Sequence, residues 1–178
     1  MGNRAVLMSI RPKWCELIAT GEKKYELRKT CPRQERPFKC YIYETGGTTE
    51  TPWIDEDGHM IFRGRSAIVG EFVCDSVEMA IVHGGAGLVC FQTVIEASSL
   101  SRQEALAYSD GGDGYAWHIS HLKMYERPKA LSEFRMANME CLRHGSDGVP
   151  VCEKGERCQI CRVKRPPQSF MYVEELNE

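Results

Sequence analysis

The sequence predicts an α+β domain in which short strands form a closed or nearly closed β-barrel, with short flanking helices and a cysteine-bearing insert. Three observations indicate this fold: most apolar residues fall in runs of strand length, glycine and proline separate these runs, and few segments have helical spacing. Closing a small sheet into a barrel removes its exposed edges. The 178 residues fit a single domain over residues 1–178, with the insert at residues 136–164.

The expected strands are short and bounded by turn residues. The run at residues 67–77 is the strongest, because apolar side chains fill most of it. In the run at residues 24–28, Tyr25 and Leu27 leave from one face and charged side chains leave from the other. We expect strands, in chain order, at residues 5–10, 24–28, 39–44, 67–77, 115–119, 122–125 and 170–173.

A first helix is expected directly after the opening strand. Pro12 suits its first turn, because proline lacks the N–H that would be left without a partner there. Trp14, Leu17 and Ile18 have the spacing of one apolar helix face. Gly21 is expected to end the helix.

A second, shorter helix is expected to end at about residue 108. Ser101 and Glu104 have the spacing of a capping box, in which each side chain bonds the other residue's backbone N–H. Residues 45–66 are rich in glycine and acids, and they predict a long loop or a hairpin excursion. The Gly-Gly-Ala-Gly run at residues 84–87 predicts a turn, because no Lys-Ser/Thr pair follows it as in a phosphate loop.

The net charge of -2 conceals an uneven distribution. Residues 1–40 hold ten Lys/Arg against four Glu, and residues 152–167 hold five against two, so the remaining chain is acidic. A local cationic surface for an anionic ligand is therefore compatible with the overall charge. The alternative is that these clusters are ordinary solvated faces.

The sequence favours a cytoplasmic location and no membrane attachment. No apolar run approaches the length of a membrane span. The first residues lead directly into a strand-like run and do not resemble a signal peptide.

The nine cysteines predict a metal site and not a disulfide framework. Their number is odd, and four of them lie in apolar or alternating stretches typical of small core residues. The other four follow the pattern C-x10-C-x5-C-x2-C, with His144 nearby, and the last pair has the spacing of half a zinc knuckle. We therefore expect a structural zinc ion on Cys141, Cys152, Cys158 and Cys161. The alternative is an exposed flexible loop with unligated thiols.

Three charged residues follow the expected helix end at Gly21. Lys23 emerges near the helix–strand corner, and Glu26 and Arg28, two apart on a strand, leave from one face. A cation, a carboxylate and a guanidinium in one cleft suit a planar polar ligand such as a nucleobase. The alternative is an ion pair on a solvated strand, in which a partly exposed Lys23 adds little stability.

The run from Gly21 to Arg28 resembles the G-x-K-x-x-E-x-R signature of the ASCH domain family, a branch of the PUA-like superfamily. Other segments resemble the family as well, and the last of them resembles the ending of phage and bacterial members. They are residues 7–14, 70–72, 117–120, 131–134 and 166–175. The resemblance covers nearly the whole chain except residues 45–66 and about 136–164.

This resemblance implies a PUA-like barrel, a cleft onto which the signature residues point, and association with nucleic acid, often RNA. One enzymatic branch hydrolyses the acetyl amide of N4-acetylcytidine. Its catalytic lysine matches Lys23 and its arginine matches Arg28, whereas its nucleophilic threonine falls at Glu26. A carboxylate is a poor acyl acceptor, so Glu26 is expected to act as a base for water and Lys23 to stabilise the oxyanion. Glu71 and Glu104 are candidates for a further carboxylate of that branch.

The expected ligand-binding residues are Lys23, Glu26 and Arg28, with Ser9 of the opening strand and Trp117. Trp117 is a candidate stacking platform for a base, and the alternative is a core tryptophan that closes the barrel. His118 and His121 are not expected to bind a metal, because residues three apart on a strand point to opposite faces.

The leading hypothesis is a module that binds RNA, another single-stranded nucleic acid or a modified nucleoside. An amidohydrolase of acylated nucleosides, with Lys23 and Glu26 as catalytic residues, is the rival, and an RNA-cleaving enzyme is a further one. A third class is an interaction protein that docks a partner through the cysteine-bearing insert.

Overall fold

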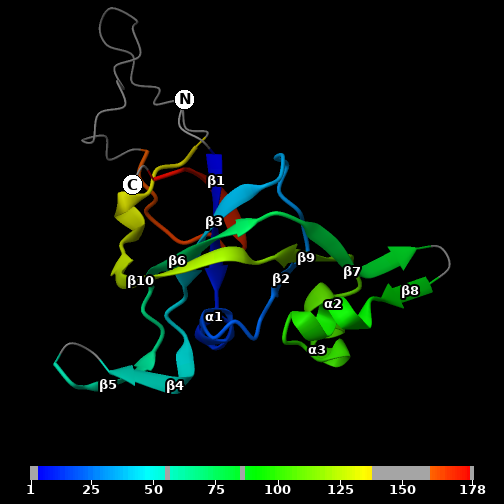
Figure 1. The fold of residues 1–178 in the computed structure, drawn as a ribbon, viewed down its shortest axis with the longest axis horizontal. Helices are drawn as coiled ribbons and strands as arrows, with labels where there is room; N and C mark the ends of the chain where they lie inside the picture. The colour runs from blue at the N-terminus through cyan, green and yellow to red at the C-terminus, as the bar shows by residue number, and fades with distance from the viewer. Residues whose placement is uncertain (1–3, 55–56, 85–86, 138–160, 177–178) are drawn as a thin grey trace, which may run out of the picture.

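The computed structural model describes residues 4–54, 57–84, 87–137 and 161–176 (Figure 1). The strands are β1 Arg4–Ile10, β2 Tyr25–Arg28, β3 Phe38–Glu44, β4 Thr48–Ile54, β5 Met60–Arg63, β6 Ala67–Cys74, β7 Val77–Gly84, β8 Gly87–Cys90, β9 Gly114–His118, β10 Ser120–Lys129 and β11 Phe170–Glu174. The helices are α1 Pro12–Ala19, α2 Gln92–Ala97 and α3 Arg102–Ser109, with a 3₁₀ turn at Leu131–Glu133.

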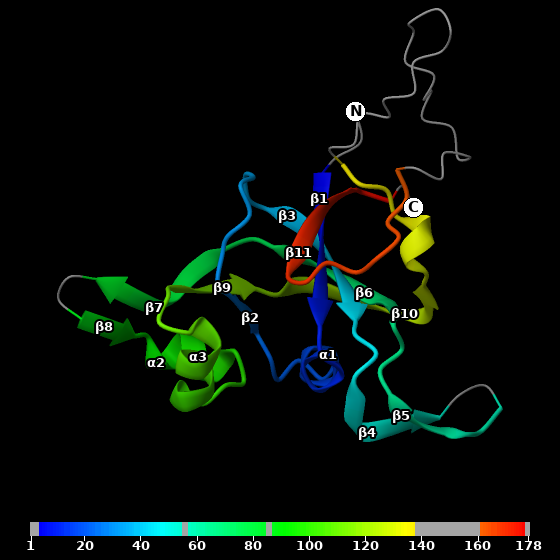
Figure 2. The same cartoon turned by 180° about the vertical axis from the view of Figure 1, so that it is seen from behind.

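A five-stranded sheet forms the centre of the domain, in the order β10-β6-β3-β1-β11. The neighbours β1 and β3 are parallel, and the other pairs are antiparallel. Figure 2 shows β11, which comes from the far end of the chain, alongside β1. Because β1 and β3 are parallel, both strands begin at the same end of the sheet, and this end is where β6 and β11 finish.

The other strands form a four-stranded sheet, β2-β9-β7-β8, and the separate hairpin β4-β5. The α+β class is therefore confirmed. The closed barrel is not found, because both larger sheets end at open edges within the described part of the chain. The chain instead passes from one sheet to the other between β6 and β7 and between β9 and β10.

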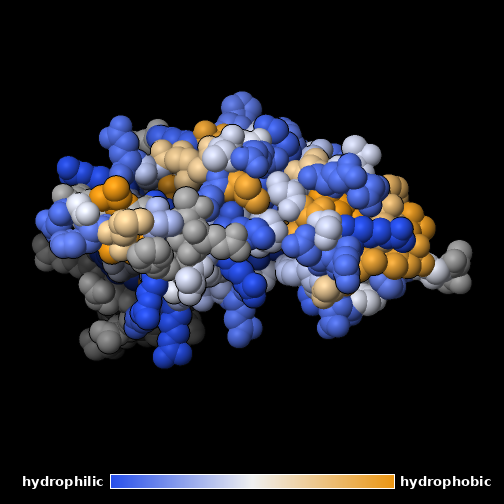
Figure 3. Space-filling view, turned by 90° about the horizontal axis from the view of Figure 1, so that it is seen from below, coloured by the Kyte–Doolittle hydropathy of each residue, from blue (hydrophilic) through white to orange (hydrophobic). Residues whose placement is uncertain are grey.

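Three apolar clusters hold these layers together. One face of the five-stranded sheet packs against α1 and Trp117. Its other face packs against Phe134 and Val163, which flank the expected insert. The four-stranded sheet packs against α2 and α3, with Ile95 and Ala105 as the buried helix residues. Exposed apolar side chains gather over α2, α3 and the β7–β8 hairpin (Figure 3); they are Leu88, Val89, Phe91 and Tyr108.

Most of the expected elements are present. Helix α1 begins at Pro12, helix α3 has both halves of its capping box, and residues 45–66 contain a hairpin. The run at residues 67–77 is one long strand in the prediction, but β6 ends at Cys74 and β7 begins at Val77. No described helix is long and apolar enough to cross a membrane.

Candidate functional site

The corner between α1 and β2 determines where Lys23 lies. Helix α1 ends at Ala19, and Gly21 has a φ of 76°, a conformation that glycine adopts without a Cβ clash. The backbone N–H of Lys23 then donates to Leu17 O at 2.9 Å, and that of Lys24 donates to Ala97 O at 2.8 Å. These bonds fix the corner to both α1 and the end of α2.

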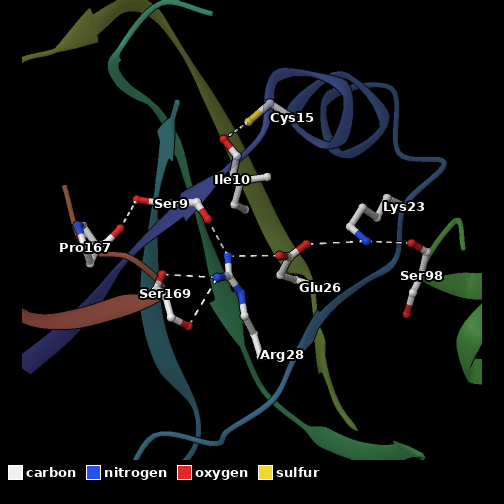
Figure 4. A network of polar contacts seen from close by, with 9 residues as sticks. All are labelled: Ser9, Ile10, Cys15, Lys23, Glu26, Arg28, Ser98, Pro167 and Ser169. Carbon is white, nitrogen blue, oxygen red and sulfur yellow. Dashed lines mark hydrogen bonds and ion pairs between the residues drawn. The ribbon is translucent and has the colours of Figure 1, made fainter. Parts of the chain in front are cut away.

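Lys23, Glu26 and Arg28 form one connected cluster, with Glu26 in the middle (Figure 4). One carboxylate oxygen of Glu26 lies 3.0 Å from Arg28 Nη2, and the other lies 3.5 Å from Lys23 Nζ. The three residues are only 3%, 7% and 4% exposed, in chain order. The prediction that they converge is confirmed, and the solvated ion pair is wrong because water hardly reaches them.

Arg28 also ties β2 to the five-stranded sheet. Its Nη2 donates to Ser9 O at 2.8 Å, and its Nη1 donates to Ser169 O at 3.2 Å. The hydroxyl of Ser9 donates to Pro167 O at 2.6 Å, so Ser9 lies beside the cluster but is engaged with the C-terminal segment. The Nε of Arg28 is buried and has no hydrogen-bond partner among the described residues.

Lys23 has three neighbours that differ in chemistry. Its Nζ donates to Ser98 O at 2.6 Å, lies near Glu26, and is 5.0 Å from the ring centre of Trp14. Burial lowers the pKa of Lys23 from its usual 10.5, and the charge of Arg28 lowers it further, whereas Glu26 raises it. The expectation of a partly exposed lysine is therefore wrong.

The alternation of β2 places Leu27 and the charged pair on opposite faces, as the sequence predicts. Leu27 lies in the cluster of α2 and α3, and Tyr25 packs at its edge, half exposed, with its hydroxyl donating to Glu78 at 2.5 Å. Because both faces of β2 are covered, its charged residues are buried even though β2 is an edge strand of its sheet.

Trp117 does not offer a stacking face. It is completely buried, and the rings of Phe38 and Phe170 pack edge-on at 5.8 Å and 5.2 Å from it. The prediction of a base platform is thus corrected to the core tryptophan that the sequence left as the alternative. Its register partner across β2 and β9 is Glu26.

Two aromatic residues that the sequence did not single out as ligand contacts, Trp14 and Tyr108, border the cluster. Trp14 is half buried and faces Lys23, and Tyr108 is 39% exposed. Burial raises the pKa of Tyr108, while the charge of Arg28 lowers it and that of Glu26 raises it, so its hydroxyl lies within the field of both. Sequence reasoning overlooked them because helical spacing marks Trp14 as a core residue and nothing marks Tyr108.

The two candidates for a further carboxylate lie elsewhere. Glu71 contacts Lys39 and the hydroxyl of Tyr125. Glu104 closes the capping box of α3 with Ser101. Neither has a described contact with Lys23. His118 pairs with Asp75 at 2.7 Å, which leaves it apart from the cluster as well.

The predicted zinc ligands fall mostly outside the described residues. Cys141, Cys152 and Cys158 lie in the segment 138–160, and only Cys161 is placed, in a buried position. Its carbonyl accepts from the backbone N–H of Met136, so the chain leaves and re-enters the domain at adjacent points. Among the described residues, no group of three or more His, Cys, Asp or Glu is arranged to hold a metal.

Comparison with known proteins places the fold in a class. No family model and no curated protein matches the sequence. Solved structures of the ASCH protein from Zymomonas mobilis are similar: its crystal structure has a TM-score of 0.55 at 15% identity, covering 96% of this chain and 88% of that one. Structures of two of its point mutants give 0.54 and 0.55, also at 15% identity, with 91% and 89% of their chains covered.

The chain therefore has an ASCH-type α+β fold. This finding confirms, at the level of the fold, the resemblance that the G-x-K-x-x-E-x-R run indicates.

Proposed function

We propose that this protein binds RNA, another single-stranded nucleic acid or a modified nucleoside through Lys23, Glu26 and Arg28. The observation that carries the proposal is the burial of three connected charges beside two partly exposed aromatic rings. Removing charges from water is costly, and a stable core is usually better served by apolar residues of similar size. Such a cluster is more typical of recognition than of stability alone.

The chemistry of the cluster suits the edge of a base. The guanidinium of Arg28 and the ammonium of Lys23 donate to carbonyl or ring-nitrogen acceptors, and the carboxylate of Glu26 accepts from an exocyclic amino group. The unpartnered Nε of Arg28 provides one further donor. Trp14 and Tyr108 supply ring surface at the border of the cluster, and such surface favours the splayed bases of single strands.

Binding assays with short RNAs test this proposal. We expect a single strand to bind more tightly than a duplex of the same sequence, because a duplex keeps its bases stacked and the larger part of the chain is acidic. The dependence on salt should correspond to fewer than about eight released ions, since the footprint is small. Equal affinity for both forms, or a steeper salt dependence, contradicts the proposal.

The lowered pKa of Lys23 favours a second candidate, hydrolysis of the acetyl amide of an N4-acetylcytidine-type nucleoside. Glu26 takes a proton from a water molecule, whose oxygen attacks the amide carbonyl carbon, and Lys23 stabilises the resulting oxyanion. The proton then passes to the leaving N4 nitrogen as its bond to carbon breaks. Acetate and cytidine are the products.

A nucleoside panel that includes N4-acetylcytidine separates the two candidates. Release of cytidine that is abolished by Glu26→Gln supports hydrolysis, whereas saturable binding without product supports a binding module. The same incubations with an RNA oligonucleotide report strand cleavage, the remaining enzymatic alternative.

We also propose that Cys141, Cys152, Cys158 and Cys161 hold a structural zinc ion. The described end of the insert supports this proposal, because Cys161 is buried and its backbone is anchored to Met136. Zinc bound by four thiolates supplies the local core that a polar segment of this length lacks.

A further inference from the structure

The cations of residues 1–40 are divided between two places in the fold. Lys23 and Arg28 belong to the buried cluster, whereas Arg4, Arg33 and Lys39 gather where β1 and β3 begin. Arg4 and Ser9 stand at opposite ends of β1, about 17 Å apart at the usual rise of a strand. The second group is therefore separate from the proposed base-binding site.

A pocket of about 780 Å³ opens among these cations. The parallel pair β1–β3 and the antiparallel partners β6 and β11 bring its walls together at one end of the sheet. Its lining consists of Arg4, Arg33, Gln34, Glu35, Pro37, Phe38, Lys39, Val73 and Glu175.

The cationic wall of the pocket is held in place by specific contacts. Arg4 lies over the ring of Tyr172 at 4.4 Å, and its Nε and Nη2 donate to Gln34 Oε1 at 3.0 Å and to Arg33 O at 2.8 Å. The backbone N–H of Arg33 donates to the hydroxyl of Tyr172 at 2.7 Å. The loop that carries Arg33 and Gln34 is thus fastened to β1 and β11.

Several donors of this wall have no acceptor among the described residues. Gln34 turns its Oε1 to Arg4, and its Nε2 is buried without a hydrogen-bond partner. The exposed guanidinium of Arg33 has no described ion pair. A buried amide donor without a partner costs free energy, which an acceptor in the pocket recovers.

The carboxylates of the pocket leave a net attraction for anions. Lys39 lies 3.0 Å from Glu175 and 3.4 Å from Glu71, so these three charges largely offset one another. Glu35 is the one lining carboxylate without a described ion pair, and it faces two arginines.

We propose that this pocket binds a phosphate group, with Arg33, Arg4 and the Nε2 amide of Gln34 as donors. Phosphate oxygens accept several charge-assisted hydrogen bonds, and arginine matches their geometry. The phosphate belongs either to a free nucleotide or to the backbone of a nucleic acid strand. This proposal does not depend on base binding by Lys23, Glu26 and Arg28.

Nuclear magnetic resonance with the intact protein tests the proposal. Inorganic phosphate, a nucleoside monophosphate and a short single-stranded oligonucleotide are titrated separately at low salt, and the side-chain amide resonances are followed. The Gln34 amide should shift saturably, while the amide of Gln103, which is exposed on α3, should not. Shifts with all three probes indicate a phosphate site in general, and shifts with the oligonucleotide alone indicate a site for the strand backbone.

Matched variants separate this pocket from general attraction. Arg33→Ala should weaken binding about tenfold or more, whereas Arg127→Ala, which removes an exposed arginine of β10, should leave it unchanged. Glu35→Gln should strengthen binding because it removes the opposing charge. No saturable shift of Gln34 with any probe, or equal effects of Arg33→Ala and Arg127→Ala, overturns the proposal.

Discussion

Glu26 is the residue on which the cluster depends electrostatically, because it lies between two cations that have almost no contact with water. Its two carboxylate oxygens face different partners, so one side chain compensates both charges. Arg28 has further backbone acceptors, whereas Lys23 has one backbone acceptor and a ring. The cost of changing each residue therefore differs.

Glu26→Gln should destabilise the fold by about 3–5 kcal/mol, because it leaves two buried cations without a counter-charge. Lys23→Met should change stability by less than about 1.5 kcal/mol, because it has a similar volume and leaves Glu26 paired with Arg28. Urea unfolding of the three proteins measures both effects. Equal losses in the two variants contradict this account of the cluster.

The depressed pKa of Lys23 predicts a pH effect on stability. In the folded protein this pKa lies below its usual 10.5, so between the two values the unfolded chain binds more protons. The free energy of unfolding should therefore rise with pH in this window and fall again as the pH decreases. Urea midpoints of the natural sequence and Lys23→Met, compared from neutral pH to 10.5, isolate this contribution. Parallel profiles count against it.

At this scale, the sequence predicted the convergence of the charged residues but not their surroundings. Two-residue spacing on a strand is a local property, so it correctly placed Glu26 and Arg28 on one face. The burial of Trp117 and the exposure of Tyr108 depend on which sheet and helix cover them, and periodicity does not contain that information.

Among the elements, α3 borders the candidate site, and its N-terminus is held by the capping box. The hydroxyl of Ser101 accepts from the backbone N–H of Glu104, and the Glu104 carboxylate accepts from the backbone N–H of Ser101. That backbone bond, together with the Ser101 hydroxyl, lowers the pKa of Glu104. The same helix carries Tyr108.

Ser101→Ala should destabilise the protein by about 1 kcal/mol, the usual cost of losing an N-cap. Because the pKa of Glu104 is lowered in the fold, its contribution is present above the usual value of 4.5 and is lost as the pH falls through the lowered pKa. Urea unfolding at neutral and acidic pH measures both effects. Ser132→Ala serves as the control, since only the carbonyl of Ser132 has a described hydrogen bond. An equal loss in the control excludes a capping effect.

Elements with local signals were predicted well, and those fixed by long-range pairing were not. Pro12 and Gly21 determine α1 through their own backbone preferences. The break between β6 and β7 was missed, because apolar residues continue through it, and only the pairing of β6 with β3 and of β7 with β9 shows where each strand ends. Helix α2 gave no cap signal, and its ends have no side-chain cap.

In the whole molecule, two open sheets replace the expected barrel. The argument for closure was that exposed strand edges are unfavourable, but edges can also be covered by helices or loops. Here α2 and α3 cover one face of the four-stranded sheet, and the C-terminal segment is fastened to β1 through Ser9. The α+β class follows from the number and length of the strands, whereas closure depends on pairings that the sequence does not specify.

The cysteine-bearing insert is expected to bring one equivalent of zinc per chain. Elemental analysis of protein purified without a metal-binding tag should find it, and a chelator should release it together with reactive thiols at Cys141, Cys152 and Cys158. Less than about 0.2 equivalents of zinc, with all four predicted ligands reactive before the chelator is added, rules out the site.

The central claim is that the buried cluster recognises the ligand, and the affinity of Lys23→Met for single-stranded RNA tests it most directly. Lys24→Met is the matched control, because it removes the adjacent, exposed lysine and changes the net charge equally. At one fixed salt concentration, Lys23→Met should bind about tenfold more weakly or worse, since a charge-assisted contact is lost, while Lys24→Met should bind nearly as well as the natural sequence. If both variants bind equally well, the cluster is a structural clamp between the sheets and the claim is wrong.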